Sequence, residues 1–134
     1  MVLLPLLLPT ALALTPVEVL DAWDEQRAAA WSAGDVAGLR SLYTPGSAAG
    51  RADVTMLRAW QHRGLRVEGL RMQVFAVDVR RRTPARLVLD VTDRLVGGVT
   101  LPGRVALPVD RPSRHRVVLR RTAGEWRVVS STPP

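Results

Sequence analysis

Alternating apolar and polar residues between Leu70 and Val96 predict one long β-hairpin. In its second half the apolar residues share one parity, as expected for a strand with one buried face. The other parity, assigned to solvent, holds Arg86, Asp90, Thr92 and Arg94. If Arg80 opposes Arg86 across the loop 81–85, apolar side chains face each other along the hairpin. The resulting pairs are Val79 with Leu87, Val77 with Leu89 and Phe75 with Val91.

The apolar parity changes within the first half of this hairpin. Leu70, Met72 and Val74 are even-numbered, whereas Phe75 and Val77 are odd-numbered. One extra residue in a strand shifts the parity and bends the sheet. The sequence therefore predicts a β-bulge near residues 73–74.

Three helices are predicted before the hairpin. Thr15 is a favourable N-cap for the first, and Glu18 completes a capping box with it. The apolar stripe of this helix includes Trp23 and Trp31, and Gly34 ends it. Its charged residues, among them Asp21, Asp24, Glu25 and Arg27, are assigned to the opposite face.

Two shorter helices follow. Asp35 caps the second, whose inward positions are Leu39, Leu42 and Tyr43. The third is expected from about residue 49 to residue 62. Its core face is predicted to consist of Met56, Leu57 and Trp60.

The end of the chain predicts further antiparallel strands. Gly97-Gly98 is interpreted as a flexible turn, and the prolines within 99–109 allow at most a short edge hairpin. A tight turn at Ala123-Gly124 joins the last two strands. The expected pairs there are Arg121 with Trp126, Leu119 with Val128 and Val117 with Ser130. Helices followed by antiparallel strands indicate an α+β fold, with the helices on one face of the sheet.

Composition narrows the functional classes. The 134 residues suit one domain, and the absence of cysteine excludes disulfides and thiolate chemistry. All nineteen basic residues are arginine, and the chain has no lysine, isoleucine or asparagine, which indicates a GC-rich genome. The net charge of +7 is compatible with an anionic partner, but Phe75 and Trp126 are the only large aromatics among the basic strands. The interpretation favoured is a solvated basic face rather than nucleic-acid binding.

Residues 1–14 form a nearly unbroken apolar run. The run is too short to span a bilayer as a helix and has the length of a signal-peptide core, although no basic segment precedes it. We expect it to be a leader or a truncated signal or anchor, and residues 15–134 to form a single domain. The protein is accordingly expected outside the cytoplasm, secreted or membrane-anchored, with membrane contact only through this segment.

Asp93 is the first candidate for chemistry, because it interrupts the core-facing parity of the hairpin. A carboxylate at such a position is costly unless it is paired or faces a cavity. His115 and Ser130 are expected near it if the long strands are neighbours. We expect a structural role, with Asp93 in a hydrogen-bonded cluster or paired with Arg71 or Arg121.

No cofactor is expected. The chain has only two histidines, His62 and His115, on different elements, and no acidic pair has ligand spacing. No glycine-rich loop is expected between a strand and a helix, so the sequence gives no indication of nucleotide binding either.

Two short segments carry a family resemblance. The run from Ala28 to Asp35, followed by Leu39, Leu42, Tyr43 and Pro45, resembles the opening of the nuclear transport factor 2-like superfamily, which includes SnoaL-like cyclases and ketosteroid isomerases. The closing Gly124-Glu125-Trp126-Arg127-Val128 looks like its final strand, and 91–97 resembles small exported or anchored actinobacterial members of unknown role. The resemblance implies a cone-shaped fold, in which a strongly curved sheet wraps the first helix and encloses a pocket.

The resemblance leaves two functions open, because this fold serves both enzymes and binding domains. A non-catalytic extracytoplasmic domain that binds a protein partner or a small apolar ligand is preferred, and a homodimer is compatible with it. The alternative is a cavity enzyme for proton transfer, cyclisation or dehydration, with Asp93 as acid or base. A pocket lined by Asp93, His115 and Tyr43 would favour the enzyme, and one filled by Trp23, Trp31 and Phe75 would favour binding. The pocket candidates are Trp23, Tyr43, Phe75, Asp93, His115 and Ser130.

Overall fold

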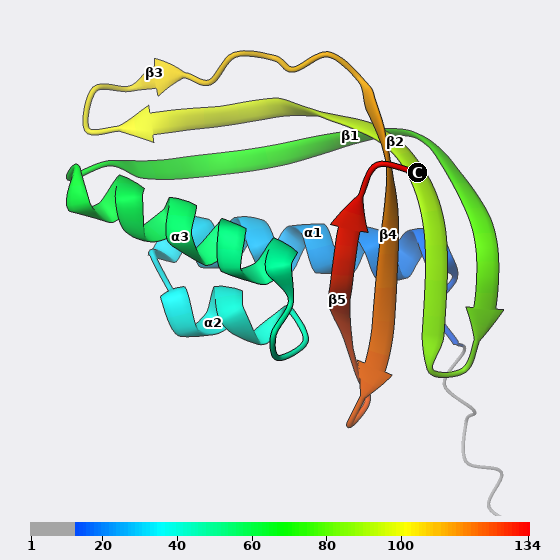
Figure 1. The fold of residues 1–134 in the computed structure, drawn as a ribbon. Coiled ribbons are helices and arrows are strands. Elements are labelled where there is room, and N and C mark those ends of the chain that lie inside the picture. Colours follow the sequence, from blue (N-terminus) through cyan, green and yellow to red (C-terminus); the bar gives the residue numbers. More distant parts are fainter. Residues whose placement is uncertain (1–12) are drawn as a thin grey trace, which may run out of the picture.

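The computed structural model describes residues 13–134, which form three helices and a curved antiparallel sheet (Figure 1). The helices are α1 (Pro16–Ala33), α2 (Val36–Ser41) and α3 (Ala48–His62). The strands are β1 (Arg66–Thr83), β2 (Arg86–Leu101), β3 (Val105–Ala106), β4 (Ser113–Thr122) and β5 (Glu125–Thr132). The predicted α+β class is confirmed. The leader expected at 1–14 lies outside the described residues, except for its last two.

The helix ends follow the capping signals in the sequence. The Thr15 side chain accepts a hydrogen bond from the Glu18 amide, and the Glu18 carboxylate accepts one from the Thr15 amide. α1 ends at Gly34, whose φ of 64° is in the left-handed region. Asp35 and Ser47 cap α2 and α3. Within residues 13–134, no helix combines the length and apolar character that crossing a bilayer requires.

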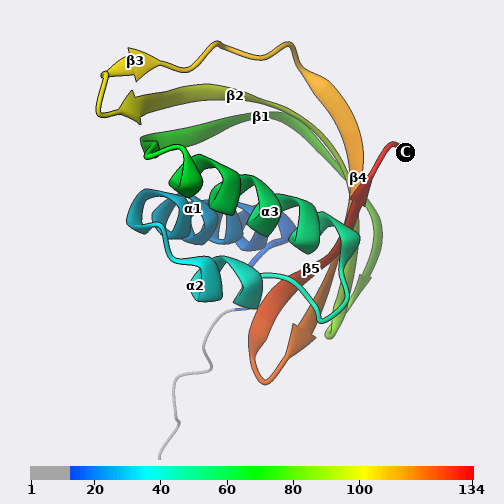
Figure 2. The same ribbon diagram turned by 60° about the vertical axis from the view of Figure 1, so that its left-hand side comes forward.

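The sheet has the order β1-β2-β4-β5, and the short β3 pairs with β2. Figures 1 and 2 show β1 and β2 arching over α1 and α3 and then bending down beside β4 and β5. Register shifts in the β1–β2 pair lie between Val74 and Ala76 and between Val79 and Arg81, among other places. The predicted bulge is thus present, close to its expected position, and such irregularities allow the long strands to curve.

The turn of the long hairpin is tighter than predicted. Thr83 opposes Arg86 across Pro84-Ala85, so the predicted pairing of Arg80 with Arg86 is wrong. The predicted pairs of Val79 with Leu87 and of Val77 with Leu89 are wrong as well, because Val79 opposes Leu89 and Val77 opposes Val91. Phe75 falls at a bulge, where half of its surface is exposed and its ring centre lies 5.4 Å from the Arg94 guanidinium carbon.

Two further expectations about strands are corrected. Gly97 and Gly98 are not a turn but part of β2, and Leu107 packs against the backbone of Gly98, where a Cβ atom would lie 2.7 Å from the leucine Cδ1. In the last hairpin Leu119 opposes Val128 as predicted, but a register shift makes Val117 oppose Ser131 instead of Ser130.

Asp90 was assigned to solvent by parity, yet only 2% of it is exposed. Arg116 donates hydrogen bonds of 2.8 and 3.1 Å to its carboxylate, and Arg114 lies 3.3 Å away. The hydrogen bonds from Arg116 hold the pKa of Asp90 below its usual value. Arginine side chains from the neighbouring strand therefore cover this carboxylate on the outer face of the sheet.

The core lies between the helices and the inner face of the sheet. Leu39, Leu89, Val91 and Leu119 are fully buried. Trp23 packs edge-on against Tyr43, with ring centres 5.3 Å apart, and its indole N–H donates to the Leu42 carbonyl at 2.8 Å. Trp23 therefore links α1 to the segment that follows α2.

Replacing Trp23 tests this packing. Trp23→Ala is expected to lower the free energy of unfolding by about 3 to 5 kcal/mol, because the side chain is buried. Trp23→Phe keeps most of the apolar contact and removes one of the two donors to the Leu42 carbonyl, which keeps the Val128 amide, so a smaller loss of about 0.5 to 1.5 kcal/mol is expected. Urea denaturation measures both. An alanine variant as stable as the wild type would show that Trp23 is not part of the core.

Candidate functional site

A cavity of about 360 Å³ lies between α1, α3 and the inner face of the sheet. Trp23, Met72 and Val117 contribute to its apolar wall. The polar side chains in its lining are Asp24, Arg27, Tyr43, Asp53, Asp93, His115 and Ser131. A concave, mostly apolar site with a few converging polar groups is the usual form of a small-molecule site.

Asp93 and His115 reach the cavity from neighbouring strands. In β2, Leu89, Val91 and Asp93 alternate with outward residues, so Asp93 shares their inner face. His115 on β4 opposes Val91 and therefore lies on the same face, one pair away from Asp93. The imidazole Nδ1 and the Asp93 carboxylate are 3.6 Å apart. Burial raises the pKa of Asp93 above its usual value, and the charge of a protonated His115 opposes that rise.

Asp93 is therefore not paired with an arginine. Among the described residues its charged neighbour is His115, so the predicted partners Arg71 and Arg121 are wrong. The covered aspartate with several arginine partners is Asp90, on the other face of β2.

Asp24 on α1 faces the same cavity. Burial, followed by the negative charge of Asp93, raises the pKa of Asp24 to about 7, while Arg27 opposes the rise. Two carboxyl groups whose charges repel each other in a partly dry site do not both ionise readily. The cavity thus holds a carboxyl group that can give up or accept a proton near neutral pH.

Asp53 on α3 has the opposite character. Its carboxylate accepts two hydrogen bonds of 2.7 Å from Arg27, one of 2.6 Å from the Tyr43 hydroxyl and one of 3.0 Å from the Trp31 indole. Burial alone would raise the pKa of Asp53, but these donors outweigh it and hold the pKa below its usual value. Asp53 is therefore an ionised, fully paired carboxylate that holds the wall of the cavity together.

An apolar hollow of about 320 Å³ adjoins the cavity and shares Arg27, Met56 and Met72 with it. Leu70, Leu95 and Leu107 line its far part, beneath the long hairpin. The two hollows together offer a polar end near Asp24 and Asp93 and an apolar extension away from it.

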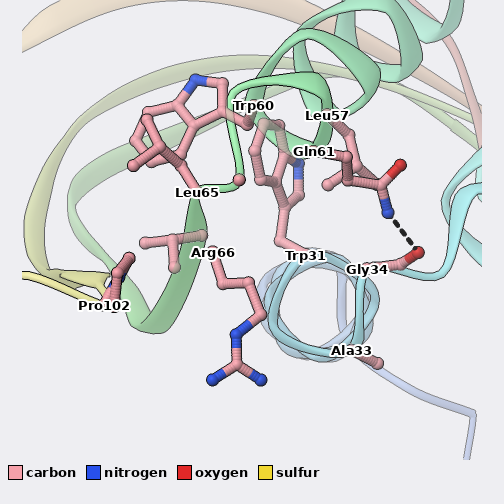
Figure 3. Close-up of a pocket in the computed structure, with 11 residues that line it drawn as sticks. Trp31, Ala33, Gly34, Leu57, Trp60, Gln61, Leu65, Arg66 and Pro102 are labelled. Carbon is pink, nitrogen blue, oxygen red and sulfur yellow. Dashed lines mark hydrogen bonds between the residues drawn. The ribbon is translucent and has the colours of Figure 1, made fainter.

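A separate pocket of about 440 Å³ lies where the end of α1 meets the end of α3 and the start of β1 (Figure 3). Trp31, Trp60, Leu65 and Pro102 surround it, and Gln61 donates a hydrogen bond of 2.8 Å to the Gly34 carbonyl at its edge. Arg66 is the one charged side chain among its described lining residues. This pocket lacks acid–base groups, so we place the candidate chemistry in the cavity with Asp24 and Asp93.

The structure brings together four of the six predicted pocket residues: Trp23, Tyr43, Asp93 and His115. Phe75 lies outside, at the bulge that exposes its ring. Ser130 is replaced by its neighbour Ser131 because of the register shift in the last hairpin. No group of three or more His, Asp or Glu side chains within 13–134 has an arrangement that would hold a metal ion.

Sequence reasoning missed Asp24, Arg27 and Asp53. A signal was present in α1, because Leu20, Asp24, Arg27 and Trp31 recur at helical spacing and share one face. Two charged residues therefore continue a buried apolar stripe. On α3, Asp53 precedes Val54 and lies one turn before Leu57, both of which are buried.

Replacing Asp93 tests its environment. Because the pKa of Asp93 is raised in the folded state, its ionised form weakens the fold, and this loss grows as pH rises above the unfolded-state value of about 3.9. Asp93→Asn should therefore be at least as stable as the wild type at pH 7, and its advantage should shrink toward pH 4.

Urea denaturation across this pH range measures the effect. Each unit by which the Asp93 pKa differs between the folded and unfolded states changes the free energy of unfolding by about 1.4 kcal/mol. Asp110→Asn, at an exposed position before β4, is the matched control and should change little. A marked loss of stability in Asp93→Asn at pH 7 would indicate a structural ion pair instead.

Comparisons with known proteins agree on the fold. No family model matches the sequence, and no curated protein matches it. An NTF2-like protein of unknown function in nutrient uptake from Rhodospirillum rubrum is 23% identical, with a TM-score of 0.53 over 84% of this chain and 93% of that one. A protein described as a candidate dehydratase of the NTF2-like family, from Streptomyces avermitilis, is 17% identical, with a TM-score of 0.53 over 86% and 92% of the chains. The intermembrane space region of chloroplast protein ARC6 is 14% identical, with a TM-score of 0.59 over 87% and 92%. The chain thus has the fold of the nuclear transport factor 2-like (NTF2-like) superfamily.

Proposed function

We propose that the cavity binds a small molecule with an apolar body and one polar end, and that Asp24 and Asp93 exchange a proton with that end. The observation that carries this proposal is the pair of carboxyl groups with raised pKa values in one cavity. A structural ion pair would instead lower both values, as it does for Asp53. Perturbed carboxyl groups in a cavity are typical of acid–base sites.

Asp24 is assigned the proton-transfer role. A general acid or base works best when its pKa lies near the working pH, and the pKa of Asp24 is about 7. Burial and, after it, the negative charge of Asp93 keep that value high. The His115 imidazole lies 3.6 Å from the Asp93 carboxylate.

The rest of the lining matches a ligand with one polar end. The hollow that adjoins the cavity is lined mostly by apolar side chains, more than half of them Met or Leu, and Arg27 and Asp110 are its charged lining residues. A ring system could occupy that part by apolar contact, while a hydroxyl or carbonyl group lies near Asp24.

The pocket composition favours the enzyme over the non-catalytic binding domain. Asp93, His115 and Tyr43 line the cavity, whereas Phe75 lies outside. The candidate dehydratase with a similar fold supports the same reaction class, since dehydration requires proton transfer to and from the substrate.

We also propose that residues 1–14 direct the protein to an extracytoplasmic site. The apolar run that motivates this proposal is independent of the cavity. Cell fractionation of the full-length protein should recover it with the membrane or outside the cytoplasm. Recovery in the soluble cytoplasm alone would contradict export and anchoring and would leave the cavity proposal intact.

A base-sensitive probe tests proton transfer without knowledge of the natural substrate. In 5-nitrobenzisoxazole a base removes the ring C–H proton, the N–O bond breaks and a coloured nitrophenolate forms. The wild type should accelerate this reaction, with a rate that rises through pH 7 as Asp24 ionises. Asp24→Asn should lower the rate by about 100-fold or more, the contribution of a positioned general base.

Glu25→Gln is the matched control, since Glu25 is an exposed neighbour on α1. It should retain the full rate. Equal rates in Asp24→Asn and the wild type would overturn the assignment of Asp24 as the base. A wild-type rate no higher than that of free acetate would overturn proton transfer altogether.

A further inference from the structure

A second concave surface, distinct from the cavity, lies between α2, the α2–α3 connection, the first part of α3 and β5. Its volume is about 700 Å³. We call it the arginine groove, after Arg40, Arg51, Arg58 and Arg127 in its lining. Tyr43 is the one described residue that lines both this groove and the cavity with Asp24.

All charged side chains that line the groove are positive. Its four arginines come from α2, α3 and β5, and none of its described lining residues is acidic. The arginines that face a buried carboxylate lie outside the groove, among them Arg27 at Asp53 and Arg116 at Asp90. The one carboxylate within ion-pair distance of a groove arginine is Glu125, 3.8 Å from Arg127, and its side chain is 74% exposed. Like charges gathered in a concave surface focus a field that attracts anions.

Several donors are available beside the arginines. Thr44 and Thr55 contribute hydroxyl groups to the lining. Arg51 is held in place by a 2.7 Å hydrogen bond from its Nη1 to the Gly46 carbonyl, which leaves its other N–H groups free to meet a ligand. The Nε of Arg127 is buried and has no hydrogen-bond partner among the described residues. A buried unpaired N–H is unfavourable, so Arg127 gains from an acceptor.

We propose that the arginine groove binds a phosphomonoester, a group with two negative charges and several acceptor oxygens. The planar guanidinium presents paired N–H donors that match phosphate oxygens. The groove lining has four arginines and no carboxylate, so it suits a dianion better than a monoanion, because each positive charge adds to the attraction. The groove also has room for an organic group attached to the phosphate. This proposal does not depend on the chemistry of the cavity.

Titration calorimetry with phenyl phosphate, on the full chain at low salt, tests the proposal. The wild type should bind phenyl phosphate more tightly than benzoate, which carries one negative charge. Its affinity for phenyl phosphate should fall as salt is added, because salt screens exposed charges. Arg40→Gln combined with Arg58→Gln should weaken binding by about tenfold or more, roughly 1.4 kcal/mol. Both arginines are exposed, so this variant should fold normally.

The matched control is Arg63→Gln combined with Arg121→Gln. Both are exposed arginines outside the groove, so this variant has the same net charge as the groove variant. It should bind phenyl phosphate as the wild type does. If the two variants bind phenyl phosphate equally weakly, the loss depends only on the net charge of the protein, and the proposal is overturned. Failure of the wild type to bind would overturn it as well.

Vesicles distinguish the source of the phosphate. Phosphatidic acid presents a phosphomonoester at a membrane surface, and phosphatidylcholine serves as the uncharged vesicle. Binding to phosphatidic acid vesicles that is lost in the groove variant would assign the site to a lipid headgroup. Binding of phenyl phosphate without vesicle binding would assign it to a soluble phosphomonoester. Binding of neither form would contradict the proposal.

Discussion

The carboxylate of Asp53 holds the helical layer in one arrangement. Its four hydrogen bonds come from two side chains of α1, Arg27 and Trp31, and from Tyr43 after α2. A carboxylate buried to this degree is tolerated only because its acceptor sites are filled and a guanidinium balances its charge. The same interaction engages Arg27, which would otherwise be the natural partner of Asp24 one turn earlier on α1. Burial and the negative charge of Asp93 therefore raise the pKa of Asp24, and the charge of Arg27 only partly opposes that rise.

The curvature of the sheet completes the site. β-Bulges let the long β1–β2 pair bend over α1 and α3, so the inner face becomes the wall of a cavity instead of a flat packed layer. On that wall the strand alternation places Asp93 and His115 inward, and the register shift in the last hairpin places Ser131 beside them. The polar groups of the cavity thus come from both layers, and their proximity depends on how the layers pack.

Local signals in the sequence predicted much of the fold. Thr15 and Asp35 act within one turn of their helices, and Leu119 and Val128 pair across a tight turn, so neighbouring residues determine these features. Register was harder to predict. A bulge in β1 moved Phe75 to the outer surface, and a separate register shift between β4 and β5 exchanged Ser130 for Ser131. The parity of apolar residues locates an inserted residue only approximately, and an error of one residue changes which face a side chain occupies. His115 was expected near Asp93 and lies 3.6 Å from it. The arginine partners of Asp90 were not predictable, since arginine occurs throughout the neighbouring strands and only the packed sheet selects which guanidinium reaches this carboxylate.

The central claim is that Asp24 and Asp93 carry raised pKa values in a shared cavity. Carbon-13 NMR titration of the aspartate carboxyl carbons measures this directly in the wild-type protein. We predict that the Asp24 carboxyl titrates near pH 7 and that Asp93 also titrates above the usual value for aspartate, while Asp53 stays ionised to lower pH than usual. Titration of both Asp24 and Asp93 near pH 4 would contradict the account.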